Sequence, residues 1–309
     1  MEGDSFQRAG VEVEKDLHRQ RIENLINDKA AYAGDRTIAL MCKDESFGVP
    51  RLGYADRVEN ITSTGLYHKY KEILRDATVH LYAVGNFTSD QFEALALRAF
   101  SPLAEMRFTA VETAVKAPTV SPVEKPIATV VEQMDVQQGV LCVGLRSTVL
   151  YQDDMYPALL VYNGILGGFP HSKLFVNVRE KASLAYYASS RMYGLKGILL
   201  IQSGIQIENY EQAKAIILEQ IRAMETEITE EERSFTIQGL INQYKLSDDQ
   251  PLTDAMMDVY ARLGGKKRSV DALIEAVQAV TIQDVQEVAR TVKVDTIYFL
   301  RDEEGISHA

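Results

Sequence analysis

The sequence predicts an α+β fold of two homologous domains, each a mixed or antiparallel sheet covered by helices, with the first domain incomplete. Three observations predict it. Strand patterns and helix patterns come in separate blocks, a short sequence pattern recurs, and a proline-containing stretch divides the chain. Segregated blocks of this kind are typical of α+β folds, because strict alternation would predict parallel βαβ units.

The recurring pattern is the main evidence for two homologous domains. Residues 22–27 (IENLIN) match residues 237–242 (IQGLIN) at four positions. Helix-then-strand passages at 58–82 and 277–299 continue the correspondence. The later copy starts near Ile127, and the same spacing places the start of the earlier copy roughly 90 residues before residue 1. We therefore expect one and a half copies of one domain.

The predicted domain boundaries follow from this repeat and from a segment with the composition of a linker. Residues 115–126 contain Pro118, Pro122 and Pro126 among small and polar residues, as in a connecting segment. Residues 1–114 are then predicted to form the C-terminal half of the first domain. Residues 127–309 are predicted to form a complete second domain.

The first domain is predicted to be mostly helical. Apolar residues at helical spacing predict one long helix or two consecutive helices over residues 11–43. Thr62 and Thr88 are good N-caps for two further helices, which extend to about residues 74 and 100. Between them, residues 78–84 have the composition of a strand.

The second domain shows both patterns in blocks. Strands are predicted at residues 128–134, 139–145, 184–192, 197–207 and 296–300. Helices are predicted at residues 155–166, 172–180, 210–224, 229–244, 252–263, 270–277 and 282–292.

Composition excludes several functional classes. The 309 residues are 46% hydrophobic and 25% charged, as in an ordinary globular protein. The net charge of −11 argues against nucleic acid or an anionic membrane as a partner, since both favour Lys and Arg. Cys42 and Cys142 form no metal-type spacing. No apolar run approaches the roughly 18 residues of a membrane helix, and no signal peptide is visible. We therefore expect a cytoplasmic protein that does not enter a membrane.

The densest motif lies at residues 164–186. The paired glycines Gly167 and Gly168 allow a helix to end in a sharp turn before the next helix. Arg179 comes late in that next helix, and Tyr186 lies on the following strand. A guanidinium and a phenol brought together can hydrogen-bond a peptide carbonyl or a developing oxyanion. The alternative is that Arg179 pairs with a nearby carboxylate and Tyr186 packs in the core.

This motif resembles the second domain of the pitrilysin/insulinase family of zinc peptidases, which includes the mitochondrial processing peptidases. The matching residues are Gly167-Gly168, Ser172-Lys173-Leu174-Phe175, Val178-Arg179-Glu180-Lys181 and Leu184-Ala185-Tyr186. The resemblance extends over essentially the whole chain and implies duplicated α+β domains. It also implies that Arg179 and Tyr186 hold the substrate backbone.

The zinc chemistry of that family requires a His-x-x-Glu-His motif, in which two histidines bind the ion and the glutamate acts as general base. None of the five histidines of this chain fits that spacing. The resemblance places Glu23 as a candidate for the third zinc ligand, where active members carry a Glu-Glu pair, but the next residue is Asn24. We therefore expect no catalytic residues and no zinc site in this chain, with zinc in a partner or in a missing N-terminal segment.

Three functions remain open at this point. The leading hypothesis is a non-catalytic peptidase-family protein that forms half of a peptide-binding clamshell with a zinc-bearing catalytic sister, as a heterodimer or within a homodimer. The second is an active zinc metalloendopeptidase whose His-x-x-Glu-His segment lies upstream. The third is a structural or binding subunit without a proteolytic role.

Overall fold

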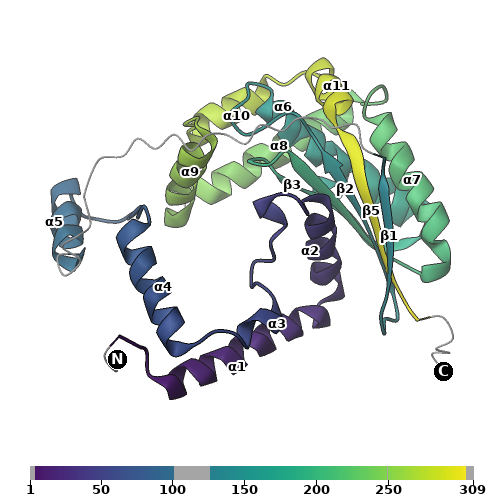
Figure 1. Ribbon diagram of the computed structural model, residues 1–309. Coiled ribbons are helices and arrows are strands. Elements are labelled where there is room, and N and C mark those ends of the chain that lie inside the picture. The colour runs from purple at the N-terminus through teal and green to yellow at the C-terminus, as the bar shows by residue number, and fades with distance from the viewer. Residues whose placement is uncertain (1–3, 101–125, 249, 304–309) are drawn as a thin grey trace. The chain divides into compact units, whose positions relative to one another are not determined.

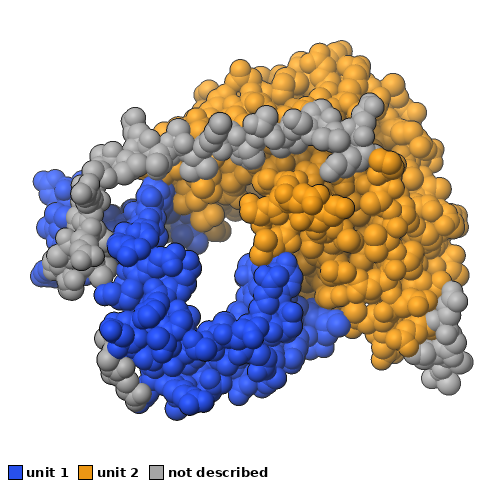
Figure 2. All heavy atoms as spheres, in the orientation of Figure 1, with its two compact units in different colours: residues 1–27, 50–113, 251–255 blue, residues 28–49, 114–250, 256–309 orange. Residues whose placement is uncertain are grey.

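The computed structural model of the chain describes residues 4–100, 126–248 and 250–303 (Figure 1). These residues belong to two compact units (Figure 2). Unit 1 comprises residues 1–27, 50–113 and 251–255, and unit 2 comprises residues 28–49, 114–250 and 256–309. Apart from Pro126, the predicted linker 115–126 lies outside the described residues.

Unit 2 is built on a five-stranded mixed sheet, and this confirms the predicted α+β class (Figure 1). The order of the strands is β1-β5-β2-β4-β3. Strand β1 pairs with β5 in parallel, whereas β5, β2, β4 and β3 pair in antiparallel fashion. Their bounds are Ala128–Gln133 (β1), Gly139–Arg146 (β2), Ala185–Tyr193 (β3), Ile198–Ile205 (β4) and Lys293–Arg301 (β5).

One face of this sheet is covered by helices. Buried side chains of five helices pack with those of the strands in the larger core of the protein. These helices are α6 (Tyr156–Asn163), α7 (Tyr210–Ala223), α8 (Glu230–Asp248), α10 (Val270–Gln278) and α11 (Ile282–Thr291). A further helix, α9 (Pro251–Gly264), follows α8 in the chain. The apolar positions that recur at helical spacing in the sequence are the ones that face the sheet.

Helix α2 (Lys29–Met41) covers the opposite face of the sheet. Its N-cap is Asp28, whose carboxylate accepts a hydrogen bond from the amide of Ala31 at 2.9 Å. The buried residues of this smaller core are Ala33, Ile38, Met41, Cys42, Val136, Val140, Cys142, Ile198, Leu200, Tyr298 and Leu300. Both cysteines in it are free thiols. The sheet is thus covered by helices on both faces.

A carboxylate joins α2 to two strands. Glu132 on β1 accepts hydrogen bonds from the hydroxyls of Tyr32 and Tyr298, the latter at 3.0 Å, and pairs with the guanidinium of Arg36 at 3.2 Å. Burial alone would raise the pKa of Glu132, but these hydrogen bonds hold it below its ordinary value. Because the partners lie far apart in sequence, this polar cluster fixes how α2 sits on the sheet.

Two buried tyrosines give a matched pair for a stability test. The hydroxyl of Tyr162, in the larger core, has no hydrogen-bond partner among the described residues, whereas that of Tyr298 donates to Glu132. We expect Tyr162→Phe to raise the free energy of unfolding by about 1 kcal/mol, because it removes an unsatisfied polar group, and Tyr298→Phe to lower it by a similar amount. Chemical denaturation measures both changes, and a loss of stability in both variants would contradict the assignment.

Unit 1 contains the helices α1 (Arg8–Asn24), α3 (Ala55–Val58), α4 (Ser63–Asp76) and α5 (Ser89–Phe100). Two predicted N-caps are confirmed. The hydroxyl of Thr62 accepts from the amide of Gly65 at 3.1 Å, and that of Thr88 accepts from the amide of Gln91 at 3.2 Å. Helices α1 and α2 are the two consecutive helices that the sequence allowed over residues 11–43.

The strand predicted at residues 78–84 is wrong for the described structure. These residues have no regular secondary structure and pair with no strand in the described part of the chain. A strand is stabilised by the hydrogen bonds of a neighbouring strand, so a β-type sequence without one remains irregular.

The order of elements along the chain is similar in two places. Helices α1, α2, α3 and α4 precede residues 78–84, and helices α8, α9, α10 and α11 precede β5. The first matching pattern spans the end of α1 and a 3-10 turn at Leu25–Asn27, and its counterpart lies within α8. Two homologous domains with the boundaries given above remain our proposal for this organisation.

Candidate functional site

The motif at residues 164–186 folds in unit 2 into two π-helical segments and the start of an edge strand. The first, η3 (Gly164–Gly168), directly follows α6, and the second, η4 (Phe175–Lys181), leads toward β3. The sequence predicted ordinary helices at these places. Because π-helical turns are rare and are found frequently at functional sites, their occurrence twice in one motif marks it as the candidate site.

Gly167 permits the close approach of η3 to β3. A Cβ atom added to Gly167 would lie 2.5 Å from the backbone nitrogen of Ser190 and 2.7 Å from its hydroxyl. The hydroxyl of Ser190 in turn donates to the side-chain oxygen of Asn163 at 2.9 Å. Gly168 is less crowded, since its added Cβ would lie 3.2 Å from the nearest atom. The structure therefore leaves less room for a side chain at Gly167 than at Gly168.

We expect Gly167→Ala to lower the free energy of unfolding by about 1–3 kcal/mol, because a side chain there overpacks against rigid backbone. Gly168→Ala is the matched control. Its added Cβ atom is less crowded, so we expect a smaller loss in the free energy of unfolding. Thermal unfolding of the two variants measures the difference. Equal losses at both positions would contradict a special role for Gly167.

Two residues anchor the start of the following helical segment. The hydroxyl of Ser172 accepts a hydrogen bond of 3.4 Å from the amide of Phe175, which is the capping role that the sequence predicted. The ammonium of Lys173 is buried, donates to the carbonyl of Glu227 at 2.6 Å and pairs with Glu232 at 2.9 Å. The segment that carries Arg179 is thereby fixed at its beginning.

Arg179 lies in the last turn of η4 and is exposed. Its guanidinium stacks over the ring of Phe175, with 4.6 Å from the guanidinium carbon to the ring centroid. Tyr186 lies near the start of β3, and its side chain is 64% exposed. Tyr186 is therefore not part of the core, and the alternative that placed it there is wrong. Both side chains are free to contact a ligand.

The backbone between these two residues has an unusual conformation. Ser183 has a φ of 53°, which is the left-handed region that residues other than glycine seldom adopt. Such conformations persist where the surroundings enforce them, and they cluster at ligand-binding sites. Here the amide of Leu184 bonds to the carbonyl of Val178 at 3.1 Å and closes the turn. No sequence signal identified Ser183, because serine is not a typical residue of this region.

His171 lies in the turn between η3 and η4. Its ring stacks on Phe169 at 5.2 Å between centroids, and Nε2 lies 3.0 Å from the hydroxyl of Thr236. Burial lowers the pKa of this imidazole, although the nearby carboxylate of Glu232 opposes the shift. The residue is half-buried and holds the turn against α8, so it is more than the surface residue that the sequence suggested.

The described residues do not provide a zinc site. Glu23, the candidate third ligand, lies exposed on α1 beside Asn24, whose amide side chain accepts a hydrogen bond from Asn27 at 3.2 Å. Across residues 4–100, 126–248 and 250–303, no three His, Cys, Asp or Glu side chains are grouped so as to hold a metal ion. Of the helices in these ranges, none is long and apolar enough to cross a lipid bilayer.

Comparisons with known proteins agree on one family. The model of the peptidase M16 inactive domain matches residues 60–240. A Bacillus subtilis protein described as the probable inactive metalloprotease YmfF is 35% identical over 308 residues, which cover 99% of this chain and 71% of that protein.

Solved structures show the same fold. A conserved protein from Enterococcus faecalis superposes with a TM-score of 0.87 and 27% identity, over 99% of this chain and 72% of that one. Pitrilysin superposes with a TM-score of 0.71 and 15% identity, over 98% of this chain and 33% of that one.

Proposed function

Because the chain belongs to the peptidase M16 family and resembles its inactive domain, we propose that it holds peptide substrates for a catalytic partner without cleaving them itself. In this proposal the chain forms half of a peptide-binding clamshell. The other half is a related subunit that carries zinc, and the two form a heterodimer. The observation that carries the proposal is that Arg179 and Tyr186, at the two ends of one turn, are both exposed, in a chain whose described residues contain no group of three side chains that could hold a metal ion.

The two side chains suit the backbone of an extended peptide. The guanidinium of Arg179 can donate two parallel hydrogen bonds to carbonyl oxygens, and its charge makes them stronger than neutral ones. The phenol of Tyr186 can donate to an oxygen on which negative charge develops during attack. The ring of Phe175 limits the conformations of Arg179, so less entropy is lost when the peptide binds.

The surrounding structure keeps these donors in place. Gly167 lets η3 pack on β3, Lys173 fixes the start of η4, and the turn at Ser183 sets the direction of the strand. Groups held by packing and hydrogen bonds within about 0.5 Å of a productive geometry bind and orient a substrate better than mobile ones. The site is therefore suited to positioning, and hydrolysis is assigned to the zinc of the partner.

The relatives support this reading in part. The description of YmfF as a probable inactive metalloprotease agrees with these 309 residues, which contain no His-x-x-Glu-His motif. We include in the proposal a reducing, cytoplasmic location, which fits the two free cysteines. The substrate is a peptide in extended conformation, since the two exposed side chains are hydrogen-bond donors suited to backbone carbonyl groups.

The experiment is co-expression with a zinc-bearing member of the family from the same genome, followed by peptide-cleavage assays of each subunit and of the complex. We expect cleavage by the complex, no cleavage by this chain alone, and zinc bound only by the partner. Full activity of the partner alone would contradict the clamshell. Cleavage by this chain alone with one bound zinc would support an active metalloendopeptidase, and a stable complex that never cleaves would support a structural subunit.

A further inference from the structure

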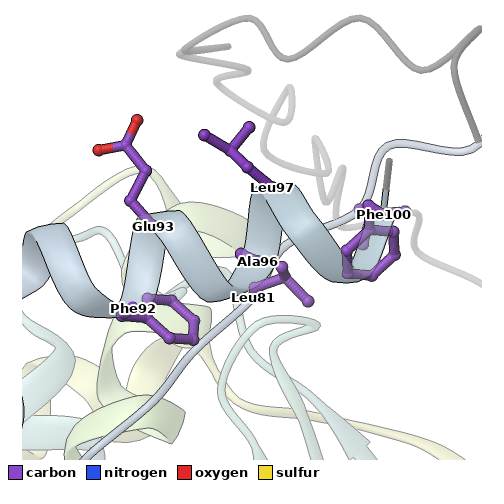
Figure 3. Close-up of a pocket in the computed structure, with 7 residues that line it drawn as sticks. Leu81, Phe92, Glu93, Ala96, Leu97 and Phe100 are labelled. Atoms are coloured by element: carbon purple, nitrogen blue, oxygen red, sulfur yellow. The ribbon is translucent and has the colours of Figure 1, made fainter. Parts of the chain in front are cut away.

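Part of the motif at residues 164–186 forms an exposed aromatic surface. Phe169 and His171 lie on the turn between η3 and η4, and Phe235 lies beside them on α8. A second apolar surface, a groove of about 280 Å³ between Leu81 and side chains of α5, belongs to unit 1 (Figure 3). Of the two, only the aromatic surface belongs to the motif.

The three rings of this surface form a corner. The rings of Phe169 and His171 are stacked, with 5.2 Å between their centroids and 8° between their planes. The ring of Phe235 stands at 71° to that of His171, with 6.0 Å between the two centroids. Phe235 is 53% exposed, and the other two residues are partly exposed. We call these three residues the aromatic corner.

The aromatic corner is held in place by close packing and by a hydrogen bond. A Cβ atom added to Gly239 of α8 would lie 2.7 Å from Cε1 of Phe169, so the glycine makes room for the ring. Nε2 of His171 lies 3.0 Å from the hydroxyl of Thr236, a residue that is fully buried. A ligand therefore meets a preformed surface, and little conformational entropy is lost when it binds.

The aromatic corner is apolar and carries no charge at neutral pH. Burial lowers the pKa of His171 below its ordinary value of 6.5, so the imidazole is mainly neutral at pH 7. Single exposed apolar side chains are common, but rings in contact form a continuous patch of the kind that binds ligands. An aromatic ligand group suits it best, because offset-stacked and edge-to-face ring pairs add to the gain from burial.

The distance along the chain gives the spacing between the aromatic corner and Arg179. His171 directly precedes the helical segment that Ser172 caps, and Arg179 follows eight positions after His171. At roughly 1.5 Å per helical residue, the two residues lie at most about 12 Å apart along this segment. An extended peptide advances about 3.3 Å per residue, so it covers this distance in about three or four residues.

We propose that the aromatic corner selects peptides with an aromatic side chain about three or four residues from the carbonyl group that Arg179 holds. The ring of the peptide packs against Phe235 and the rings beside it, while Arg179 and Tyr186 bind the backbone. Phe235 is then a specificity-determining residue. The assignment depends on the proposed peptide-holding role of this chain, and it adds the class of side chain that the site prefers.

The absence of tryptophan from this chain allows a direct test. Dye-labelled peptides of one sequence carry a single tryptophan that moves by one position from peptide to peptide, and a peptide with alanine instead is the reference. Each is titrated with the full chain, and fluorescence anisotropy gives its affinity. We expect one tryptophan position to bind roughly 30-fold more tightly than the reference. The tryptophan emission of that peptide, without the dye, should shift to shorter wavelength because its ring leaves water.

Phe235→Ala should remove most of this preference and the emission shift, and it should leave the affinity of the alanine reference within about twofold. Leu246→Ala is the matched control, because Leu246 is an apolar residue of α8 that is 73% exposed and lies outside the aromatic corner. It should keep the preference. Equal affinity of the wild type for all tryptophan peptides and the reference would overturn the proposal, and so would an equal loss of preference in both variants.

The same peptides separate the aromatic corner from the proposed function. Arg179→Ala should weaken tryptophan and alanine peptides by the same factor, whereas Phe235→Ala should weaken only the preferred tryptophan peptide. Tryptophan-selective binding that Phe235→Ala removes, by a chain whose complex with a zinc-bearing partner never cleaves, would support the corner and contradict the role in cleavage. Failure of the full chain to bind any of the peptides would overturn both.

Discussion

Arg179→Ala is expected to lower kcat/KM for peptide cleavage by the assembled complex roughly 100-fold, the size found when one preorganised donor to a developing charge is removed. The guanidinium is exposed beside the ring of Phe175, so its loss leaves no buried group unsatisfied. We therefore expect the free energy of unfolding to change by less than about 0.5 kcal/mol. A large loss of activity without a loss of stability is the signature of a substrate-holding residue.

A matched control lies further along β3, the strand that carries Tyr186. Arg191 is also an exposed arginine, and its guanidinium lies 5.4 Å from the ring centroid of Tyr193. Arg191→Ala removes the same charge and a similar ring contact, and it should leave kcat/KM within about twofold of the wild type. Tyr186→Phe should reduce kcat/KM in the same direction as Arg179→Ala. Equal losses for Arg179→Ala and Arg191→Ala would mean that net charge, rather than a specific contact, assists the substrate.

Arg146→Met is expected to lower the free energy of unfolding of unit 2 by about 3 kcal/mol, because it leaves partly buried charges without their partner. The guanidinium pairs with Asp295 at 2.9 Å and with Glu45 at 2.7 Å, and it donates to the carbonyl of Met41 at 2.7 Å. Its side chain is only 21% exposed. Denaturant unfolding measures this change in free energy. It can be followed by the fluorescence of a dye that binds apolar surface exposed on unfolding.

Lys196→Met provides the control. Lys196 also pairs with Glu45, at 2.9 Å, but its removal leaves the bonds of Arg146 in place. We expect a loss of less than about 1 kcal/mol, as for most ion pairs near the surface. If Lys196→Met destabilised the protein as much as Arg146→Met, the forked geometry of Arg146 would have no special role.

The effect of Arg146→Met should depend on pH. Burial alone would raise the pKa of Glu45, but hydrogen bonds from Lys196 and Arg146 bring it below its ordinary value of 4.5. Because the folded state lowers this pKa, the pair stabilises the protein fully above pH 4.5 and loses this contribution as the pH falls through the lowered value. The wild type and Arg146→Met should therefore converge in stability at acidic pH. A difference that stayed constant down to pH 3 would contradict this origin.

Local patterns in the sequence predicted much of the fold. The N-caps Thr62 and Thr88 were correct because capping depends on the three residues that follow. The strands of unit 2 were predicted from apolar runs and alternation, which reflect burial directly. The motif that carries Arg179 and Tyr186 is continuous in sequence, so both residues could be named before the structure was known, and their role in holding a substrate stays a prediction.

Features that depend on distant contacts could not be predicted in this way. The partners of Glu132 come from residues 32, 36 and 298, and no local pattern links them. The close approach of η3 to β3 at Gly167 also joins residues that no local pattern links. Residues 78–84 show the opposite case, since the local pattern is that of a strand but the partner strands are not among the described residues. Propensity alone therefore gave the wrong structure there.

The most direct test of the central claim is the rate of peptide cleavage by this chain mixed with a zinc-bearing member of the family from the same genome. Each subunit is assayed alone and in the mixture, and zinc is quantified in each purified protein. We predict that only the mixture cleaves, that zinc stays with the partner, and that Arg179→Ala in this chain removes most of the activity. Equal cleavage by the partner alone, or cleavage by this chain alone with its own bound zinc, would contradict the account.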